Sequence, residues 1–202
     1  QYGTVHEGGM LNGSALALVE LRPEHAAPTP RRSASENGTA HRKLLSMLPA
    51  GVDSVALSGV SVGVPGLPEA YQQARYSLAL LQAKRIPGPV VRFDAVEDLG
   101  AYRLLYHLWG SPELQQYAHE ALGGLVNRDR RGILRNTLMA YLDAGGSHVD
   151  TAERLGIHRN TLAYRLKQIA TLTGYDPTDP GPRLMLHLAL LATMLPPNPD
   201  GR

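Results

Sequence analysis

Apolar residues in the second half of the chain recur with helical spacing. The pattern predicts helices at residues 101–109, 112–125, 131–142, 147–155, 158–172 and 182–195. Within residues 158–172, Leu162, Leu166 and Ile169 recur at i, i+4 and i+7, which places one apolar stripe on the helix. The last helix is apolar on nearly every side, and we expect its buried face to comprise Leu184, Leu188 and Leu191.

The first half of the chain alternates between strand and helix patterns. Short apolar runs predict strands at residues 15–21, 52–64 and 90–93, and residues 11–21 could also be one arm of a hairpin. The run at 52–64 has a phase break at Ser58 and Gly59. Helices are predicted at 39–48 and 67–86, and repeated prolines mark residues 22–37 as a mobile loop. This α/β order, followed by helices alone, predicts an α+β protein with a boundary near residues 95–100.

Residues 147–162 have the spacing of a helix-turn-helix. Ser147, with Asp150 three residues later, forms a capping box in which both side chains satisfy free amides at a helix start. Ala152 is small enough for a second helix to cross closely, and Gly156 can take a turn conformation without a Cβ penalty. In this motif the second helix enters the major groove of DNA, with its first residues at the base edges. An ordinary helical hairpin with a solvated basic face is the alternative.

Side chains opposite the apolar stripe are of the types that bind phosphates and base edges. The recognition helix would span about residues 158–172, and its predicted DNA-binding residues are His158, Arg159, Asn160, Thr161, Tyr164, Arg165 and Lys167. We expect residues 158–161 to read the base sequence of the DNA. We expect Tyr164, Arg165 and Lys167 to contact its phosphate backbone. Three of these seven residues have alternative roles. His158 could cap the helix, Asn160 could bond within its first turn, and Tyr164 could support the helix with only its hydroxyl at a phosphate.

Net charge adds little by itself, because 20 Lys and Arg against 18 Asp and Glu leave the chain at +2. Residues 128–183 hold nine Lys and Arg and six Asp and Glu, a local charge of +3. The chain has no cysteine, which excludes disulfides and thiolate zinc sites. No secretory signal is visible, and the apolar run 184–195 is too short to span a bilayer, so we expect a cytoplasmic protein. Because the sequence starts at Gln1 without Met, we expect it to be a fragment of a longer protein.

The C-terminal residues also resemble a known family. The string IHRNTL at residues 157–162, followed by Tyr164, Arg165 and Leu166, is similar to the C-terminal helix-turn-helix of PucR/CdaR-type bacterial transcriptional regulators. The resemblance runs from about residue 134 to residue 195. It implies control of a metabolic or catabolic operon, with a small-molecule effector sensed by a domain outside this chain. Because one recognition helix buries little surface, we expect a homodimer on a two-fold, double-stranded DNA operator.

The first half resembles, more weakly, the degenerate GGDEF-like domain that often precedes this helix-turn-helix. Residues 59–64, residues 70–74 and residues 90–94 are similar to its strand–helix–strand portion. The GGDEF signature is absent, so the resemblance implies a regulatory or dimerising scaffold and not a cyclase. We therefore expect a degenerate GGDEF-like domain at residues 1–97, a helical connector at 98–130 and a helix-turn-helix domain at 131–202, with no enzyme activity and no cofactor.

One motif leaves an enzymatic alternative open. Residues 59–63 match G-x-S-x-G, the pattern of a nucleophile elbow. The β-branched residues on either side predict a straight strand through Ser61, whereas an elbow needs a sharp turn. A vestigial nucleotide-binding or hydrolytic enzyme that uses residues 59–66 is the alternative function, and an assembly module whose basic helix meets an acidic protein is another.

No two of the eight histidines lie three or four residues apart, so we expect no metal site.

Overall fold

The computed structural model describes residues 3–11, 14–21, 54–59 and 61–198, and the first two of these stretches only as backbone. β1 (Gly3–Leu11) and β2 (Ser14–Leu21) form an antiparallel hairpin with an irregularity between His6 and Gly9. The strand predicted at residues 15–21, and its alternative as a hairpin arm, both agree with this hairpin. The loop predicted at 22–37 and the helix predicted at 39–48 lie outside the described residues.

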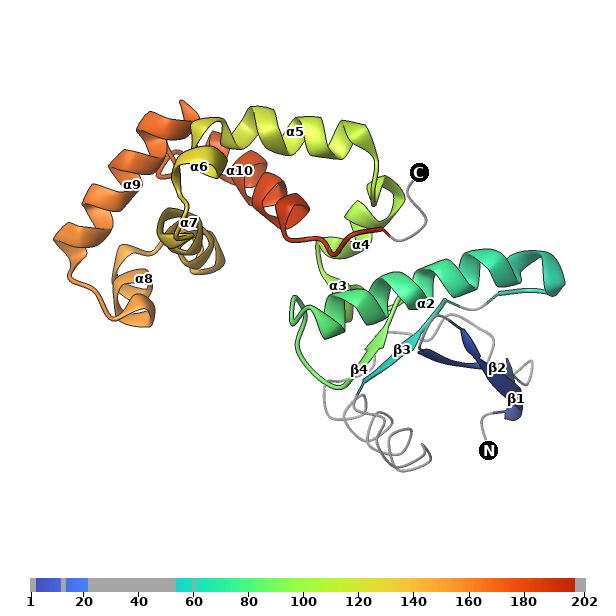
Figure 1. Ribbon diagram of the computed structural model, residues 1–202. Helices are drawn as coiled ribbons and strands as arrows, with labels where there is room; N and C mark the ends of the chain where they lie inside the picture. The colour runs from blue at the N-terminus through green and yellow to red at the C-terminus, as the bar shows by residue number, and fades with distance from the viewer. Residues whose placement is uncertain (1–2, 12–13, 22–53, 60, 199–202) are drawn as a thin grey trace.

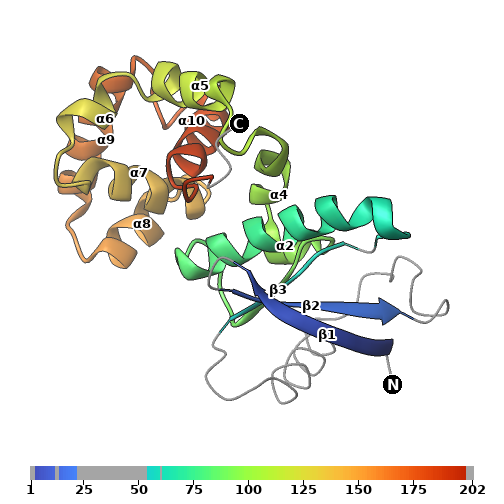
Figure 2. The same cartoon turned by 45° about the vertical axis from the view of Figure 1, so that its right-hand side comes forward.

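A second, parallel sheet joins β3 (Val55–Leu57) to β4 (Val90–Arg92), and α2 (Leu67–Gln82) connects the two strands. The helix lies along the short sheet (Figure 1; Figure 2), and its buried residues include Tyr76, Leu80 and Leu81. The predicted helix at 67–86 is confirmed, but it ends at Gln82 because Lys84 adopts a left-handed backbone, with φ of 55°. This strand–helix–strand crossover gives the protein its α/β part.

The strand predicted at residues 52–64 is mostly wrong. Of its described residues, only Val55–Leu57 pair with a neighbouring strand, in register with Val90–Arg92 of β4. Val62 and Val64 are 90% and 77% exposed, and Val64–Gly66 form a short 3₁₀ turn, η2. Their alternation in the sequence therefore does not correspond to a buried strand face.

Short helices continue from β4 and enclose an aromatic core with α2. They are α3 (Val96–Leu99), α4 (Tyr102–Leu105) and the 3₁₀ turn η3 (Tyr106–Leu108). The ring of Tyr76 meets those of Tyr106 and Trp109 edge-on, at centroid distances of 5.3 and 5.0 Å. The Tyr76 hydroxyl donates a hydrogen bond to the Tyr102 carbonyl (2.7 Å), and burial raises the pKa of Tyr76 well above its ordinary value.

The remaining helices form a second core at the opposite end of the molecule from the hairpin (Figure 1; Figure 2). They are α5 (Pro112–Leu122), α6 (Gly124–Arg128), α7 (Ile133–Asp143), α8 (His148–Leu155), α9 (Arg159–Thr173) and α10 (Pro180–Thr193). The helices predicted between residues 112 and 195 are confirmed, but Gly123, with φ of 50°, divides the segment predicted at 112–125 into α5 and α6. The helix predicted at 101–109 is α4 followed by the 3₁₀ turn η3. The predicted α+β class is confirmed, but helices make up most of the described structure.

The buried face of α10 differs from the predicted one. Leu184 is 67% exposed and Leu188 is only partly buried, whereas Leu186, Ala189 and Leu190 are buried in the second core. A helix that is apolar on nearly all sides does not reveal its inner face by periodicity, because its packing partners decide it. Leu191 is buried as predicted, but it packs in the aromatic core around α2.

Candidate nucleic-acid interface

The turn between α8 and α9 fixes how the second helix is presented. The Ser147 hydroxyl accepts a hydrogen bond from the Asp150 amide (3.3 Å), which is one half of the predicted capping box. The other half, a bond from the Ser147 amide to the Asp150 carboxylate, was predicted wrongly, because the Ser147 amide donates to the Ala144 carbonyl instead (3.1 Å). Gly156 ends α8 in the left-handed conformation, with φ of 61° and ψ of 35°, and Ala152 is buried. The local geometry therefore matches the helix-turn-helix predicted from the spacing.

The inner face of α9 is anchored by the apolar stripe. Leu162 and Ile169 are completely buried and Leu166 is 3% exposed. They pack among residues of α5, α6, α7 and α10 in the second core. Burial of this stripe leaves the opposite side of α9 turned to solvent.

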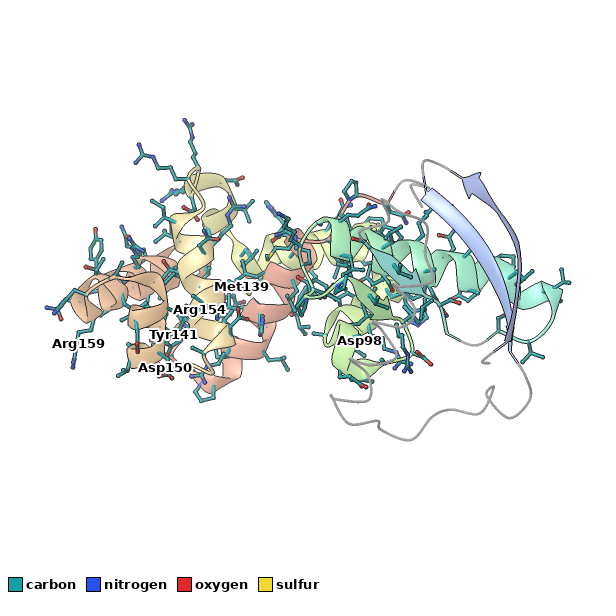
Figure 3. The ribbon with its side chains drawn as sticks, turned by 90° about the horizontal axis from the view of Figure 1, so that it is seen from below. Asp98, Met139, Tyr141, Asp150, Arg154 and Arg159 are labelled. Atoms are coloured by element: carbon teal, nitrogen blue, oxygen red, sulfur yellow. The ribbon has the colours of Figure 1, made fainter. Side chains whose placement is uncertain are left out.

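The exposed side of α9 carries most of the residues predicted to bind DNA. These exposed residues are Arg159, Asn160, Thr161, Tyr164 and Lys167. Arg159 lies at one end of the molecule, far from the β1–β2 hairpin (Figure 3). The Tyr164 ring is 63% exposed, and its hydroxyl accepts a hydrogen bond from the Gln168 amide group (3.2 Å). The first turn of α9 has no acidic residue to repel a phosphate.

His158 and Arg165 have partners inside the protein. His158 is the N-cap of α9, and its Nδ1 accepts a hydrogen bond from the backbone amide of Asn160 (3.2 Å). This contact corresponds to the capping alternative, although the ring stays exposed. Arg165 is half-buried, and its Nη1 donates a hydrogen bond to Thr137 Oγ1 on α7 (3.2 Å). Arg165 is thus held at the side of α9.

Sequence reasoning missed three arginines that lie beside α9. Arg128 is the last residue of α6, and Arg130 and Arg131 follow it in the α6–α7 turn. The three arginines line a hollow of about 450 Å³ together with Thr161, Tyr164, Arg165 and Gln168 of α9. The run of residues 128–131, RDRR, was the available signal. It gives no indication from local spacing that the turn packs against α9.

Two aspartates near the motif, Asp143 and Asp176, have partners inside the protein. Asp143 lies 3.5 Å from a guanidinium nitrogen of Arg154 and 3.6 Å from His187 Nε2. In the loop before α10, Asp176 accepts hydrogen bonds from the backbone amide and the hydroxyl of Thr178, at 2.8 and 2.7 Å. These two bonds hold the pKa of Asp176 below its ordinary value of 3.8.

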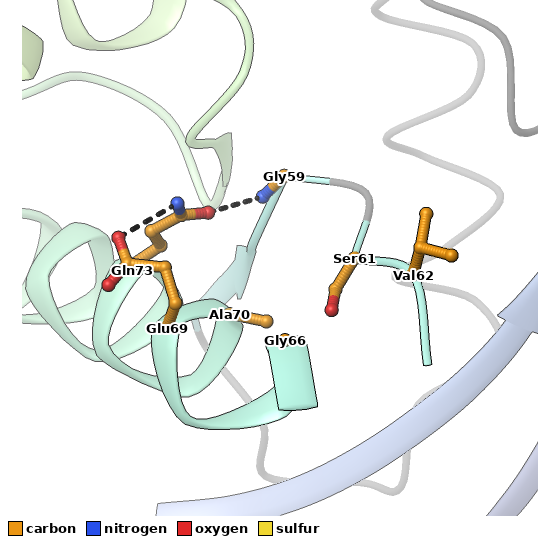
Figure 4. A pocket seen from close by; sticks show the side chains of 7 residues that line it. All are labelled: Gly59, Ser61, Val62, Gly66, Glu69, Ala70 and Gln73. Atoms are coloured by element: carbon orange, nitrogen blue, oxygen red, sulfur yellow. Dashed lines mark hydrogen bonds between the residues drawn. The ribbon is translucent and has the colours of Figure 1, made fainter. Parts of the chain in front are cut away.

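The G-x-S-x-G stretch borders a second, smaller hollow of about 200 Å³ (Figure 4). The prediction of a straight strand through Ser61 is wrong, because the described backbone there pairs with no strand. Gln73 fills one side, where its Oε1 accepts from the Gly59 amide (3.0 Å) and its Nε2 donates to Glu69 (3.2 Å). The Ser61 hydroxyl is directed toward Gly66, and no histidine is among the described residues that line the hollow. The hollow therefore brings no general base of the Ser–His type to Ser61.

The described part of the chain also bears on two other kinds of function, metal binding and membrane insertion. No group of three or more His, Cys, Asp or Glu there could hold a metal ion. None of its helices has the length and apolar character needed to cross a membrane.

Comparison with known proteins places the C-terminal half in a family. Residues 134–192 match the PucR C-terminal helix-turn-helix domain. The carbohydrate diacid regulator of Escherichia coli (strain K12) is 33% identical over 136 residues, which cover 67% of this chain and 34% of that protein. The purine catabolism regulatory protein of Bacillus subtilis (strain 168) is 28% identical over 138 residues, which cover 68% of this chain and 25% of that protein. The chain thus spans about a third or less of these two regulators.

A relative of more similar length is an uncharacterized protein encoded in the pkwA 5′ region of Thermomonospora curvata. It is 33% identical over 161 residues, which cover 77% of this chain and 83% of that protein. A solved structure, that of a regulator of polyketide synthase expression from Bifidobacterium adolescentis, is 29% identical and covers 64% of this chain and 52% of its own, with a TM-score of 0.38. With its matched helix-turn-helix domain and these relatives, the chain belongs to the family of PucR/CdaR-type transcriptional regulators.

Proposed function

We propose that the chain binds DNA sequence-specifically, with α9 in the major groove, and so regulates a metabolic or catabolic operon. The observation that carries this proposal is the two-sided character of α9. Its apolar stripe is buried in the second core, while Arg159, Asn160, Thr161 and Lys167 are exposed on the other side. The Gly156 turn that precedes it has the backbone conformation that a helix-turn-helix needs. Carbohydrate diacid regulation and purine catabolism, named for two relatives, support the class of operon.

Different residues would have different roles in this complex. Arg159 and Asn160, in the first turn, are suited to bidentate bonds with guanine and adenine edges, and Thr161 lies beside them. Lys167 and the Tyr164 hydroxyl lie farther along the helix, where they would meet backbone phosphates. His158 would act chiefly by holding the first turn in place, since its Nδ1 already accepts from Asn160.

The test starts with selection of bound sequences from a pool of random duplexes by the 202-residue chain. Arg159→Ala and Asn160→Ala should then relax the preference at single base positions, each by about 1–3 kcal/mol against the wrong base. Lys84→Gln is the matched control, because Lys84 is exposed, does not belong to α9 and is not among the residues that line the hollow beside it. Unchanged base preference in the double variant, with its helical circular dichroism intact, would show that α9 does not read sequence.

We further propose that two copies bind a two-fold operator, because a single recognition helix buries too little surface for strong specific affinity. The selected duplexes should then contain inverted half-sites about one helical turn apart, or a multiple of it. Single half-sites bound by a monomer would contradict this. A small-molecule effector, sensed by a domain outside this chain, would control the binding.

For the first half we propose a degenerate GGDEF-like scaffold at residues 1–97, a connector at 98–130 and the helix-turn-helix domain at 131–202. Support comes from the parallel β3–α2–β4 crossover. The connector contributes to both cores, because α3 and α4 pack with α2 whereas α5 and α6 pack with α9 and α10. Incubation with nucleoside triphosphates or a generic ester should give no turnover, and activity abolished by Ser61→Ala would favour the enzymatic alternative.

A further inference from the structure

A basic groove runs between α9 and the turn that connects α6 to α7. Its volume is about 450 Å³, and the residues of α9 that line it, Thr161, Tyr164, Arg165 and Gln168, follow one another at helical spacing. The groove is therefore adjacent to the exposed side of α9. The other wall consists of Arg128, Asp129, Arg130, Arg131, Ile133 and Leu134.

The one acidic residue of this turn is directed away from solvent. Asp129 is 6% exposed, and its carboxylate accepts a hydrogen bond from the Arg135 amide (2.8 Å). The Arg135 guanidinium lies 3.6 Å from the same carboxylate oxygen, and it also donates to the Asp129 carbonyl (3.3 Å). The negative charge of Asp129 is thus compensated by Arg135, which is not one of the groove residues.

The arginines of the groove retain donors for a ligand. Arg128, Arg130 and Arg131 are exposed, and none of them has an ion pair or a side-chain hydrogen bond among the described residues. Arg165 uses one donor on Thr137, which is fully buried, and a guanidinium has five. Among the described residues that line the groove, four therefore present guanidinium groups and Asp129 alone is acidic.

The backbone of the turn is fixed before any ligand arrives. Gly132 adopts the left-handed conformation, with φ of 68°, and its amide bonds to the Asp129 carbonyl (3.0 Å). The Asp129 amide bonds in turn to the Leu125 carbonyl (3.0 Å), which ties the turn to the end of α6. A ligand that binds here orders arginine side chains and not the chain itself, so the entropic cost of binding is reduced.

We propose that Arg128, Arg130 and Arg131, with Arg165, bind backbone phosphates of the duplex whose major groove α9 occupies. The inference rests on the proposed function and adds a second contact region to it. Arginine forks match phosphate oxygens bidentately, and duplex DNA offers phosphates on either side of the groove that a recognition helix enters. A free small anion would gain less, because the side chains are exposed and a single charge releases no condensed counterions.

This contact would supply affinity without sequence information. Its loss should weaken binding to all duplexes alike and make the dependence on salt less steep, by about 0.9 in the slope of log K against log salt for each lost phosphate contact. Loss of Arg159 or Asn160 should instead change the base preference. The two kinds of contact therefore leave different signatures in one assay.

The experiment compares the 202-residue chain with Arg130→Gln/Arg131→Gln on two probes, a duplex selected by the chain and a random-sequence duplex, over a range of salt. We expect the double variant to bind both probes more weakly, by the same factor, with a slope reduced by about 1.8. Arg130→Lys/Arg131→Lys should restore most of the slope, because lysine keeps the charge. Lys84→Gln should leave affinity and slope unchanged. Circular dichroism checks that the variants keep their helices.

The outcomes separate this inference from the function on which it rests. If Arg159→Ala relaxes base preference but the turn variant keeps the affinity and slope of the parent, the phosphate contact is refuted and the proposed function stands. If the parent chain binds neither probe, the proposed function fails first. Saturable calorimetric binding of inorganic phosphate or a dicarboxylate that the turn variant abolishes, with DNA binding unaffected, would also overturn the proposal.

Discussion

Asp176 shows how a single exposed residue can organise a loop. Its carboxylate accepts two hydrogen bonds from Thr178, and Asp179 then caps α10 by accepting from the Gly181 amide (3.1 Å). The charged form of Asp176 is favoured in the folded state, so the pKa of its carboxyl lies below the ordinary value of 3.8. This stabilisation is fully present above the unfolded-state pKa and is lost as the pH falls through the folded-state pKa.

Thr178→Val tests this loop, because it removes the hydroxyl bond and leaves the backbone amide in place. We expect the pKa of Asp176 to rise part of the way toward its ordinary value, since the backbone bond is the larger of the two causes. Carbon NMR titration of the carboxyl group measures the change. A pKa of Asp176 that is the same in the variant would mean that the hydroxyl contributes nothing to the charged form.

Local chemistry explains why parts of the site could be predicted residue by residue. The Ser147 cap, the Gly156 turn and the buried Leu162 depend on neighbours within a few positions, and each was expected from the sequence. The outward direction of Leu184 could not be predicted, because α5 and α7 decide which side of α10 is covered. The same holds for the α6–α7 turn beside α9, which depends on contacts between distant segments.

At the scale of elements, the two turns that flank α8 hold glycines in left-handed conformations for different reasons. At Gly156, with φ of 61°, no atom lies within 4 Å of the position that a Cβ would take. At Gly146, with φ of 86°, a Cβ would stand 2.7 Å from the guanidinium carbon of Arg183. That guanidinium donates to the Gly145 carbonyl (3.0 Å) and to the Thr178 carbonyl (3.2 Å), so it ties the α7–α8 turn to the loop before α10.

We therefore expect unequal costs from the same substitution. Gly156→Ala should lower the free energy of unfolding by about 1–2 kcal/mol, the cost of a left-handed backbone with a Cβ. Gly146→Ala should cost about 1–3 kcal/mol more, because it also displaces the two Arg183 hydrogen bonds, each worth about 0.5–1.5 kcal/mol. Urea denaturation measures both. In an Arg183→Ala background the difference between the two glycines should disappear, and its persistence would show that Arg183 is not the cause.

At the scale of the whole molecule, α10 connects the two cores. Two consecutive residues of this helix are buried in different cores. Leu190 packs in the core around α9, and Leu191 packs in the core around α2. Met139 and Ala192 pack against both cores. After α10, the Met194 carbonyl accepts a hydrogen bond from the Arg85 guanidinium (2.9 Å). The Pro196 carbonyl accepts one from the Trp109 indole (2.8 Å). The helix-turn-helix, α8 and α9, is thus connected through α10 to the core around α2.

This connection predicts that the two cores unfold together. Trp109 is the chain's one tryptophan and reports on the α2 core, whereas far-ultraviolet circular dichroism reports mainly on the helical half. Leu138→Ala, at a fully buried position of the α9 core, should cost about 2–5 kcal/mol and lower the urea midpoint equally by both probes. Leu99→Ala, its counterpart in the α2 core, should do the same from the other side. If each variant instead shifted only the probe of its own core, α10 would not transmit stability between them. A signal received by the first half could not then reach α9 through this helix.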